Sequence, residues 1–265
     1  MPTAIEVTYY VLPDSEALSH RAAAYLTTRL TESVQARGRA RLALSGGNTP
    51  RRMLEQLSDP QAEFRAQVPW KQLEIFFVDE RTVPPENAES NYRMVRETLL
   101  NRAPVEPAQV ARMQGELDPQ RAAALYETDI RLRFRLEGAE IPRFDVVLLG
   151  MGDDGHTGSL FPHTEAIDTL GRIVVANHVP QKNTWRITLS WPVLNQAREV
   201  FFLVQGSDKA EVLKRVLQGP FDPENLPSQL IRPASGKLTM FLDSAAAALL
   251  PPPGADGCGT LERTK

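Results

Sequence analysis

Short apolar runs alternate with longer amphipathic stretches along most of the chain. Seven runs have the length and composition of strands: EVTYYVL, RLALSGG, LEIFFVDE, FDVVLLGMG, RITLSW, EVFFLVQG and KLTMFLD. Helical segments are expected over residues 15–37, 50–57, 90–100, 119–136, 207–219 and 244–250. Strands that alternate with helices predict an α/β fold with a doubly wound, mostly parallel sheet and helices on both faces.

Capping residues mark the ends of several expected helices. Asp14 or Ser15 is placed to cap the first helix, and Gly38 is placed to end it. Pro50 and Ser90 stand at the starts of the next two helices, where their residue types are favoured.

The chain reads as one domain with a short tail. It shows neither a repeat of fixed period nor a Gly/Ser linker, so residues 1–250 are expected to form a single α/β domain. The last segment, 251–265, combines three prolines with glycines and charged residues and lacks apolar periodicity. We therefore expect a flexible Pro/Gly-rich tail there.

Composition narrows the class of protein. The 265 residues are 42% hydrophobic and 24% charged, as in soluble globular proteins, and the longest apolar runs are too short to span a membrane. A net charge of -3 does not favour nucleic acid, so an anionic ligand must be held by a local site. A single cysteine, Cys258, and a start without signal-peptide features predict a cytoplasmic protein. The oligomeric state stays open, with a monomer favoured.

Two strand ends carry candidate site residues. In parallel sheets, ligands bind beyond the carboxyl ends of the strands. Gly46 and Gly47 form a turn ahead of a helix, which suits either a phosphate site or a purely structural turn. Asp79 and Arg81 follow the apolar run LEIFFV, and the charged residues there are expected at the sheet rim. An acid beside an arginine could be catalytic or a solvated ion pair.

The glycine-rich segment 150–163 is the third strand end. It begins with a literal G-x-G-x-x-G, but Asp153 and Asp154 in the turn argue against a dinucleotide pyrophosphate. A loop that exposes His156 fits better, with Asp154 close enough to orient or polarise it. An unperturbed histidine, with a pKa of about 6.5, can act as a base near neutral pH. The alternative is that His156 only bonds loop carbonyls.

Two cations follow later strand ends. Arg186 opens RITLSW, and Lys209 begins a helix after EVFFLVQG. Arginine grips phosphate through two parallel hydrogen bonds, and lysine supplies a point charge, although single basic residues are usually solvated. His20, His163 and His178 lack metal-ligand spacing with one another or with Cys258, so no metal site is expected.

Five motifs together resemble the 6-phosphogluconolactonase family, which is related to glucosamine-6-phosphate deaminase. They are SGGNTP, VDER, GMGDDGHTGSLFP, RITLSWPVLN and QGSDKAEVLKRVL, in that order over most of the chain. The GxGxDGHTxSLFP pattern is the specific part. The resemblance implies a Rossmann-like fold and hydrolysis of 6-phospho-D-glucono-1,5-lactone to 6-phosphogluconate, in the oxidative pentose phosphate pathway. It also implies that no cofactor is required.

The resemblance also implies roles for residues of this chain. His156 matches the family histidine and Asp154 its acidic neighbour, while Asp79 and Arg81 are expected to lie near the substrate. The phosphate grip falls on Gly46, Gly47, Arg186 and Lys209. Two positions depart from the usual motif, namely Gly158 in place of alanine and His163 in place of glycine. His163 would add a second titratable group near the mouth of the site.

The related deaminase provides a contrast within the enzyme class. It uses a glutamate five residues after its histidine, and here that position is Phe161. The expected mechanism is therefore lactone hydrolysis, in which His156 removes a proton from water as the water attacks C1. Loop N–H groups or Arg81 would stabilise the oxyanion. A sugar-phosphate sensor is the rival outside the enzyme class, but it would need a DNA-binding module, which this sequence does not predict. The choice between δ- and γ-lactone stays open.

Overall fold

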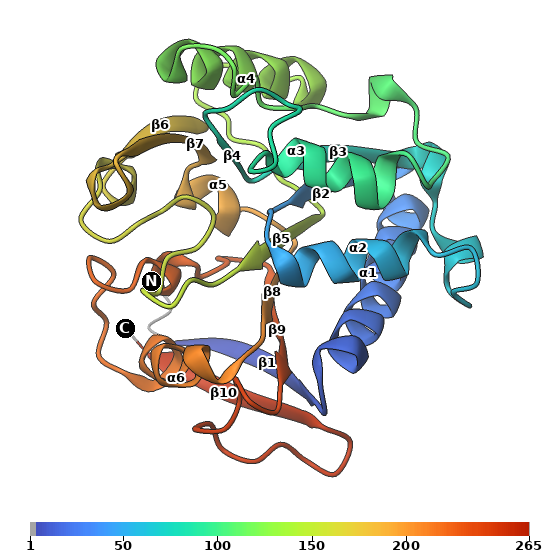
Figure 1. The fold of residues 1–265 in the computed structure, drawn as a ribbon, viewed down its shortest axis with the longest axis vertical. Coiled ribbons are helices and arrows are strands. Elements are labelled where there is room, and N and C mark those ends of the chain that lie inside the picture. The colour runs from blue at the N-terminus through green and yellow to red at the C-terminus, as the bar shows by residue number, and fades with distance from the viewer. Residues whose placement is uncertain (1–3, 265) are drawn as a thin grey trace.

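Seven strands form one mixed sheet in the order β10-β1-β9-β8-β5-β2-β3 (Figure 1). The structure is a computed structural model that describes residues 4–264, so residues 1–3 and 265 lie outside it. Its strands are β1 (Ala4–Leu12), β2 (Ala40–Leu44), β3 (Leu73–Phe77), β4 (Asp79–Arg81), β5 (Val146–Gly150), β6 (Val174–Val179), β7 (Thr184–Leu189), β8 (Glu199–Val204), β9 (Lys237–Asp243) and β10 (Cys258–Thr264). All pairs in the large sheet are parallel except β1 with β10. The predicted mostly parallel α/β fold is confirmed.

Helices cover both faces of this sheet. They are α1 (Ser15–Arg37), α2 (Asn48–Ser58), α3 (Asn91–Val95), α4 (Pro119–Phe134), α5 (Trp191–Asn195) and α6 (Ala210–Gln218). α1 and α2 pack against each other on one side of the sheet, and α5 and α6 lie on the other side (Figure 1). This two-sided cover follows from right-handed crossovers that run in both directions from the middle of the sheet.

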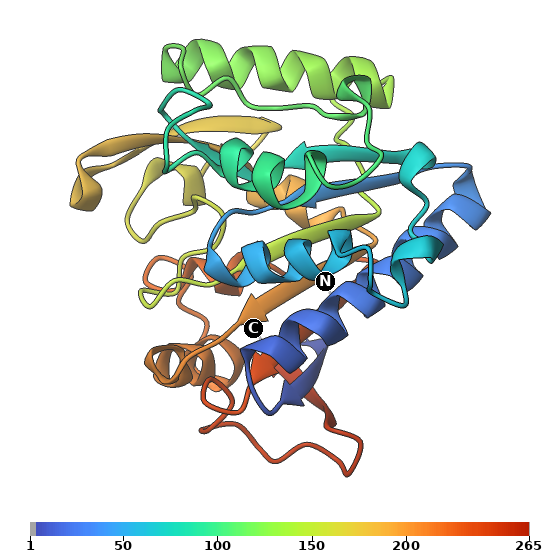
Figure 2. The same cartoon turned by 45° about the vertical axis from the view of Figure 1, so that its right-hand side comes forward.

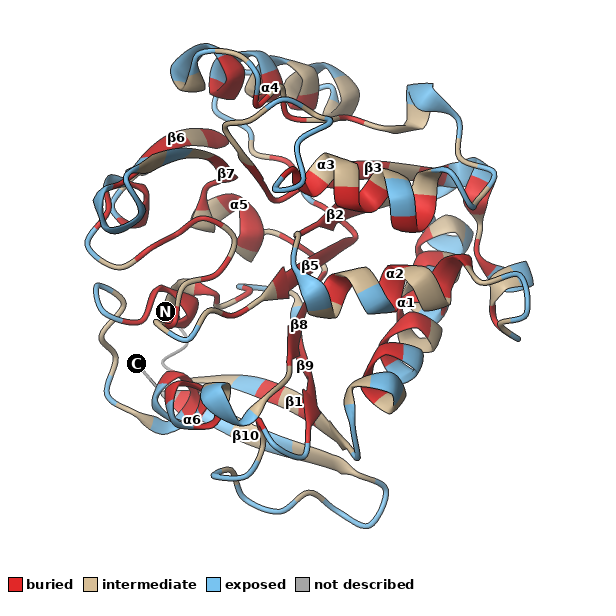
Figure 3. Ribbon diagram, in the orientation of Figure 1, coloured by how far each residue is buried: buried red, intermediate tan, exposed pale blue. Residues whose placement is uncertain are grey.

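The central strands are buried on both faces, which accounts for their continuous apolar sequences (Figure 3). All six residues of β8 are buried. The one acid among them, Glu199, accepts hydrogen bonds from the Tyr25 hydroxyl at 2.7 Å and the Thr239 hydroxyl at 3.0 Å. The central strands of the large sheet are therefore nearly all apolar, and the polar residues that could bind a ligand lie in the loops at their carboxyl ends.

The predicted helix ends are confirmed where capping chemistry is strong. The Asp14 carboxylate accepts from the backbone N–H groups of Glu16 and Ala17, and Gly38 ends α1 with a left-handed φ of 74°. Ser90 caps α3, but residues 96–100 continue it with π-helical geometry. The helix expected over 244–250 is wrong, since these residues form turns around the side chain and carbonyl of Asp243.

The segment RITLSW forms a strand outside the parallel sheet. β7 lies between β4 and β6 in a three-stranded antiparallel sheet, contrary to the single sheet expected from sequence. Asn183, with a left-handed φ of 45°, closes the short turn between β6 and β7, so the two strands must run antiparallel. Figure 2 shows this hairpin projecting from the body of the molecule.

The prediction of a flexible tail is wrong for the last described residues. Residues 258–264 form β10, which pairs antiparallel with residues 4–10 of β1, from Tyr10–Cys258 to Ala4–Thr264. Arg263 of this strand is buried, and its guanidinium donates to the carbonyls of Gln229 and Ile231. Proline and glycine dominate the composition of 251–257, but they form the loop that leads into a strand covering the edge of β1.

Candidate active site

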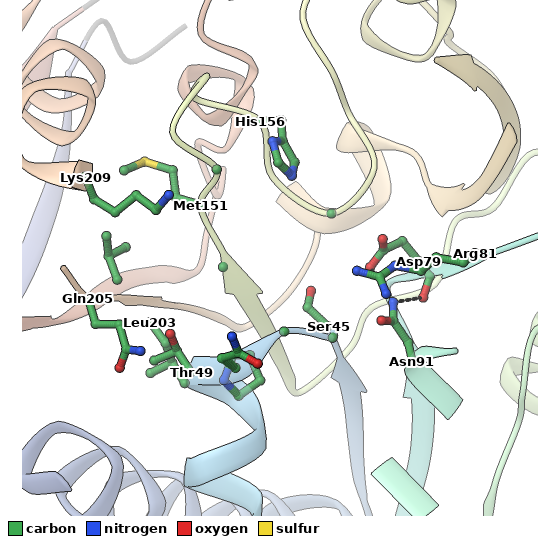
Figure 4. A pocket seen from close by; sticks show the side chains of 18 residues that line it. Ser45, Thr49, Asp79, Arg81, Asn91, Met151, His156, Leu203, Gln205 and Lys209 are labelled. Atoms are coloured by element: carbon green, nitrogen blue, oxygen red, sulfur yellow. Dashed lines mark hydrogen bonds between the residues drawn. The ribbon is translucent and has the colours of Figure 1, made fainter. Parts of the chain in front are cut away.

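A cavity of about 230 Å³ opens at the carboxyl ends of β2, β5 and β8. Six of the residues predicted from sequence line it, from four separate segments: Gly46, Gly47, Asp79, Arg81, His156 and Lys209. Figure 4 shows Lys209 reaching in from one side and Arg81 from the opposite side, with His156 between them. Residues chosen by their position at strand ends therefore lie around one cavity.

His156 and Asp154 form a tight pair beside the cavity. Nδ1 of His156 lies 2.5 Å from Oδ1 of Asp154, which also accepts from the His156 backbone N–H at 3.1 Å. Burial alone would raise the pKa of Asp154, but the hydrogen bond and charge of His156 outweigh it and lower that pKa to about 2. An ionised Asp154 requires the proton on Nδ1, which leaves Nε2 of His156 free to accept one.

The loop around this pair has no spare room. A Cβ atom at Gly152 would overlap both the imidazole of His156 and the carboxylate of Asp154. The Gly152 N–H donates to the His156 carbonyl at 2.9 Å, which closes the loop behind the pair. On its ring face, His156 stacks on buried Phe161 with centroids 4.1 Å apart and planes at 22°. The imidazole is thus fixed at its ring nitrogen, its backbone and its face.

Asn91, which no sequence motif singles out, links the VDER segment to the glycine turn. Its amide donates to the Asp79 carbonyl at 2.9 Å and lies 3.4 Å from the Asp79 carboxylate. The Ser159 hydroxyl donates to the same carboxylate at 2.7 Å. Gly46 packs so closely on Asn91 that a Cβ there would overlap the amide. Only the fold brings these residues together, from distant segments of the chain.

Asp79 and Glu80 are buried, so the solvated ion pair left open for this strand end is wrong for them. Glu80 accepts from the backbone N–H groups of Asn91 at 2.7 Å and Tyr92 at 2.8 Å, and from the Ser90 hydroxyl. Burial raises the pKa of Glu80, and these donors partly offset that effect. A carboxylate at the start of α3 therefore holds Asn91 in place, and its role is structural.

The glycine turn leads directly into α2, an 11-residue helix without a side-chain cap at Gly47. Its first N–H groups are therefore available at the cavity, because Gly46, Gly47, Asn48 and Thr49 all line the opening. Across from them, the mostly buried Lys209 side chain pairs with exposed Asp208 at 2.8 Å. A helix N-terminus facing an ammonium group is an arrangement that suits an anion.

Arg186 does not line the cavity, although Arg81 of the same small sheet does. The strand of Arg186, β7, pairs with β4, and Arg186 is in register with Arg81. Nη1 of Arg186 donates to the Thr184 hydroxyl at 2.8 Å and the Trp185 carbonyl at 3.0 Å. Burial, then the charge of Arg81, lowers the pKa of Arg186. The two arginines are thus neighbours through strand pairing.

His163 lies outside the cavity lining. It is exposed, and its Nδ1 lies 3.2 Å from Oε1 of exposed Glu224. Its left-handed φ of 58° is one that glycine adopts without strain, in keeping with the family preference for glycine at this position. Gly158 likewise has a positive φ of 54°, so it gives the loop its shape.

Two further polar atoms at the cavity belong to Ser45 of the SGGNTP motif and Gln205 of the QGSDK motif, neither of which was predicted as a site residue. Oγ of Ser45 and Oε1 of Gln205 are buried without a hydrogen-bond partner among residues 4–264, and both residues line the cavity. Buried polar groups are normally paired, so these atoms are candidates for substrate contact. The described part of the chain contains no cluster of three or more His, Cys, Asp or Glu side chains arranged for a metal ion. No helix in the same range is long and apolar enough to cross a membrane.

Comparison with known proteins identifies the class. Residues 13–240 match the family described as glucosamine-6-phosphate isomerases/6-phosphogluconolactonase. The chain belongs to this family of sugar-phosphate enzymes, because the match spans most of its length.

Its relatives point within the family to one member. The chain is 37% identical to 6-phosphogluconolactonase of Synechocystis over 91% of this chain and 98% of that protein. It is 40% identical to the human 6-phosphogluconolactonase, over 82% and 83%. The structure of 6-phosphogluconolactonase from Trypanosoma brucei superposes with a TM-score of 0.81 at 27% identity, covering 92% and 98%. A monomeric glucosamine-6-phosphate deaminase, 19% identical with a TM-score of 0.74, shares the fold.

Replacing Gly152 with alanine is expected to reduce kcat by about tenfold to a hundredfold. The added methyl group displaces His156 from Asp154, and small displacements of catalytic groups carry losses of this order. Steady-state kinetics and thermal unfolding of Gly152→Ala check this. A variant with normal kcat would show that turnover does not require a glycine at position 152.

Replacing Asp154 with asparagine is expected to lower kcat by about 10²-fold or more. Asp154, with its pKa lowered to about 2, stays ionised across the assay range and accepts the proton on Nδ1 of His156. Asparagine can instead donate to Nδ1 and hold the tautomer whose Nε2 already carries a proton and cannot act as a base. Steady-state kinetics and thermal unfolding of Asp154→Asn test this, and a folded variant with normal kcat would contradict it.

Proposed function

We propose that this chain hydrolyses 6-phospho-D-glucono-1,5-lactone to 6-phospho-D-gluconate, the second step of the oxidative pentose phosphate pathway. The observation that carries the proposal is the His156–Asp154 pair, set between two cations in one cavity. Relatives that span nearly the whole chain bear the name 6-phosphogluconolactonase. We place the reaction in the cytoplasm, with a monomer as the expected state and no cofactor.

His156 acts as the base and then the acid in this mechanism. Nε2 removes a proton from a water molecule as the water oxygen attacks C1 of the lactone. The tetrahedral intermediate collapses by breaking the bond from C1 to the ring oxygen, which takes the proton from His156 and becomes a hydroxyl group. Asp154 stays ionised, holds the Nδ1 proton and stabilises the imidazolium between these two transfers.

The remaining cavity residues bind the substrate. We assign the developing oxyanion to Arg81, since its guanidinium faces the cavity, and the sugar hydroxyls to Asp79. The 6-phosphate would lie between Lys209 and the Gly46–Gly47 turn, at the start of α2. The phosphate role proposed for Arg186 has less support, because Arg186 lies beside Arg81 and outside the cavity lining.

The deaminase reaction is the alternative within the family. A glutamate five residues after the histidine serves ring opening there, and Phe161 at this position offers only a ring face to His156. Incubation with glucosamine 6-phosphate should therefore release no ammonia. A lactonase assay with the spontaneous rate subtracted should show rapid hydrolysis of the phosphorylated lactone.

Phosphate recognition predicts a difference between two substrates. Unphosphorylated gluconolactone should be a much poorer substrate, because binding energy from the phosphate positions the carbonyl against His156. Lys209→Ala should lower kcat/KM for the phosphorylated lactone by about 10–10³-fold and hardly change the low rate on gluconolactone. Arg186→Ala is expected to follow the same pattern.

Both variants should be measured on both lactones. Equal losses on the two substrates would show that the residue supports the fold or the chemistry, and its phosphate role would have to be withdrawn.

A further inference from the structure

A second cavity, of about 570 Å³, lies at the opposite end of the same strands. The active-site cavity is lined by residues that follow β2, β5 and β8, whereas this one is lined by residues that precede or begin them. Six arginines from the ends of α1 and α4 and the starts of these strands line it: Arg37, Arg39, Arg41, Arg135, Arg143 and Arg198. The two cavities therefore lie at opposite ends of the strands and are separated by the strands' length.

This cavity concentrates positive charge in a protein that is negative as a whole. Glu140 and Asp145 also line it, and Glu74 pairs with two of its arginines. Six arginines against three carboxylates leave a local charge of +3, while the chain carries -3. Such a local field attracts anions even though the net charge repels them.

The carboxylates are already shared among several donors. Asp145, itself buried, accepts from Arg37 Nε at 2.8 Å and from the Arg41 backbone N–H at 2.8 Å, and lies 3.4 Å from Arg198 Nε. Glu74 accepts from Arg41 at 2.8 Å and lies 3.7 Å from Arg39. Each of these two carboxylates therefore contacts at least two arginines, and some guanidinium N–H groups of the cavity remain without a carboxylate partner among residues 4–264.

Three arginines retain this unused capacity. Within residues 4–264, the side chain of Arg135 has no partner, and that of Arg143 contacts only the oxygens of Ser235. Nε of Arg198 is buried and makes no hydrogen bond in the same range, and its one partner is the Asp145 carboxylate at 3.4 Å. Burial, then the charges of Arg37 and Arg143, lowers the pKa of Arg198, so these guanidinium groups repel one another. A bound anion would relieve that repulsion and use the free donors.

We infer that this arginine cavity is a second anion site, which binds a small ligand bearing a diphosphate group. Guanidinium groups bind phosphate oxygens in pairs, and a diphosphate presents enough oxygens for several of them. The net charge of +3 matches a ligand with two or three negative charges. Arg41 already covers the ring of Phe134, and Leu136 and Ile141 add an apolar wall for the organic part of a nucleotide.

Calorimetric titration with inorganic pyrophosphate, at fixed ionic strength, tests the inference. The wild-type chain should bind one pyrophosphate at this cavity, and the double variant Arg135→Gln/Arg143→Gln should weaken that binding at least about tenfold. The matched control is Arg102→Gln/Arg121→Gln, which removes the same charge at exposed positions outside the cavity and should change binding less than about twofold.

Lys209→Ala and lactonase kinetics separate this site from the active site. Binding at the arginine cavity should persist in Lys209→Ala, and kcat and KM for the lactone should be unchanged in Arg135→Gln/Arg143→Gln. ADP binding more tightly than pyrophosphate would identify a nucleotide as the natural source, and equal binding would identify the free anion.

Three results would overturn the inference. They are absence of pyrophosphate binding by the wild type, loss of all binding in Lys209→Ala, and equal weakening in the control double variant. Since none of these depends on lactone turnover, failure here leaves the proposed lactonase activity intact.

Discussion

The arrangement of the candidate site depends on the contact between the Asp154 carboxylate and the His156 imidazole. That contact needs a glycine at 152, because any side chain there would occupy the same space. It also needs the ring of Phe161 behind the imidazole and the backbone bond from Gly152 to close the loop. The glycine-rich sequence between β5 and Phe161 therefore provides room for one tightly held acid–base pair.

The candidate site lies where two sheets meet. The large parallel sheet supplies the glycine turn, the histidine loop and Lys209 from the ends of β2, β5 and β8. The small antiparallel sheet begins at Asp79, two residues after the end of β3, and pairs Arg81 with Arg186. Asn91 and Ser159 connect the two through Asp79. A cation from each side can thus face the substrate, with His156 between them (Figure 4).

Sequence patterns predict the parts of this architecture that follow from local chemistry. The apolar runs of β5 and β8 are continuous because both faces are buried, and Asp14, Gly38 and Ser90 mark helix ends through their own side chains or backbone. Polar residues gather in loops at strand ends, so the sequence makes Gly46, Asp79 and His156 candidates, and the family resemblance adds Lys209. Contacts between distant segments cannot be predicted in this way. The pattern of a strand does not specify which strand it pairs with. The segment RITLSW is therefore compatible with the parallel sheet, and only its pairing with β4 shows that Arg186 lies elsewhere.

The composition of the last segment likewise gives no sign of β10, whose short sequence forms a strand because β1 offers an open edge. Asn91 lies in an ordinary helix start, and only packing against Gly46 and Asp79 reveals its place in the site.

The central claim, that His156 performs the proton transfers, is tested most directly by the turnover of His156→Ala after subtraction of spontaneous lactone hydrolysis. His163→Ala is the matched control, because His163 pairs with Glu224 outside the cavity. The account predicts a loss in kcat of about 10²-fold or more for His156→Ala with an unchanged fold, and near-normal turnover for His163→Ala. Near-normal turnover of a folded His156→Ala enzyme would contradict it.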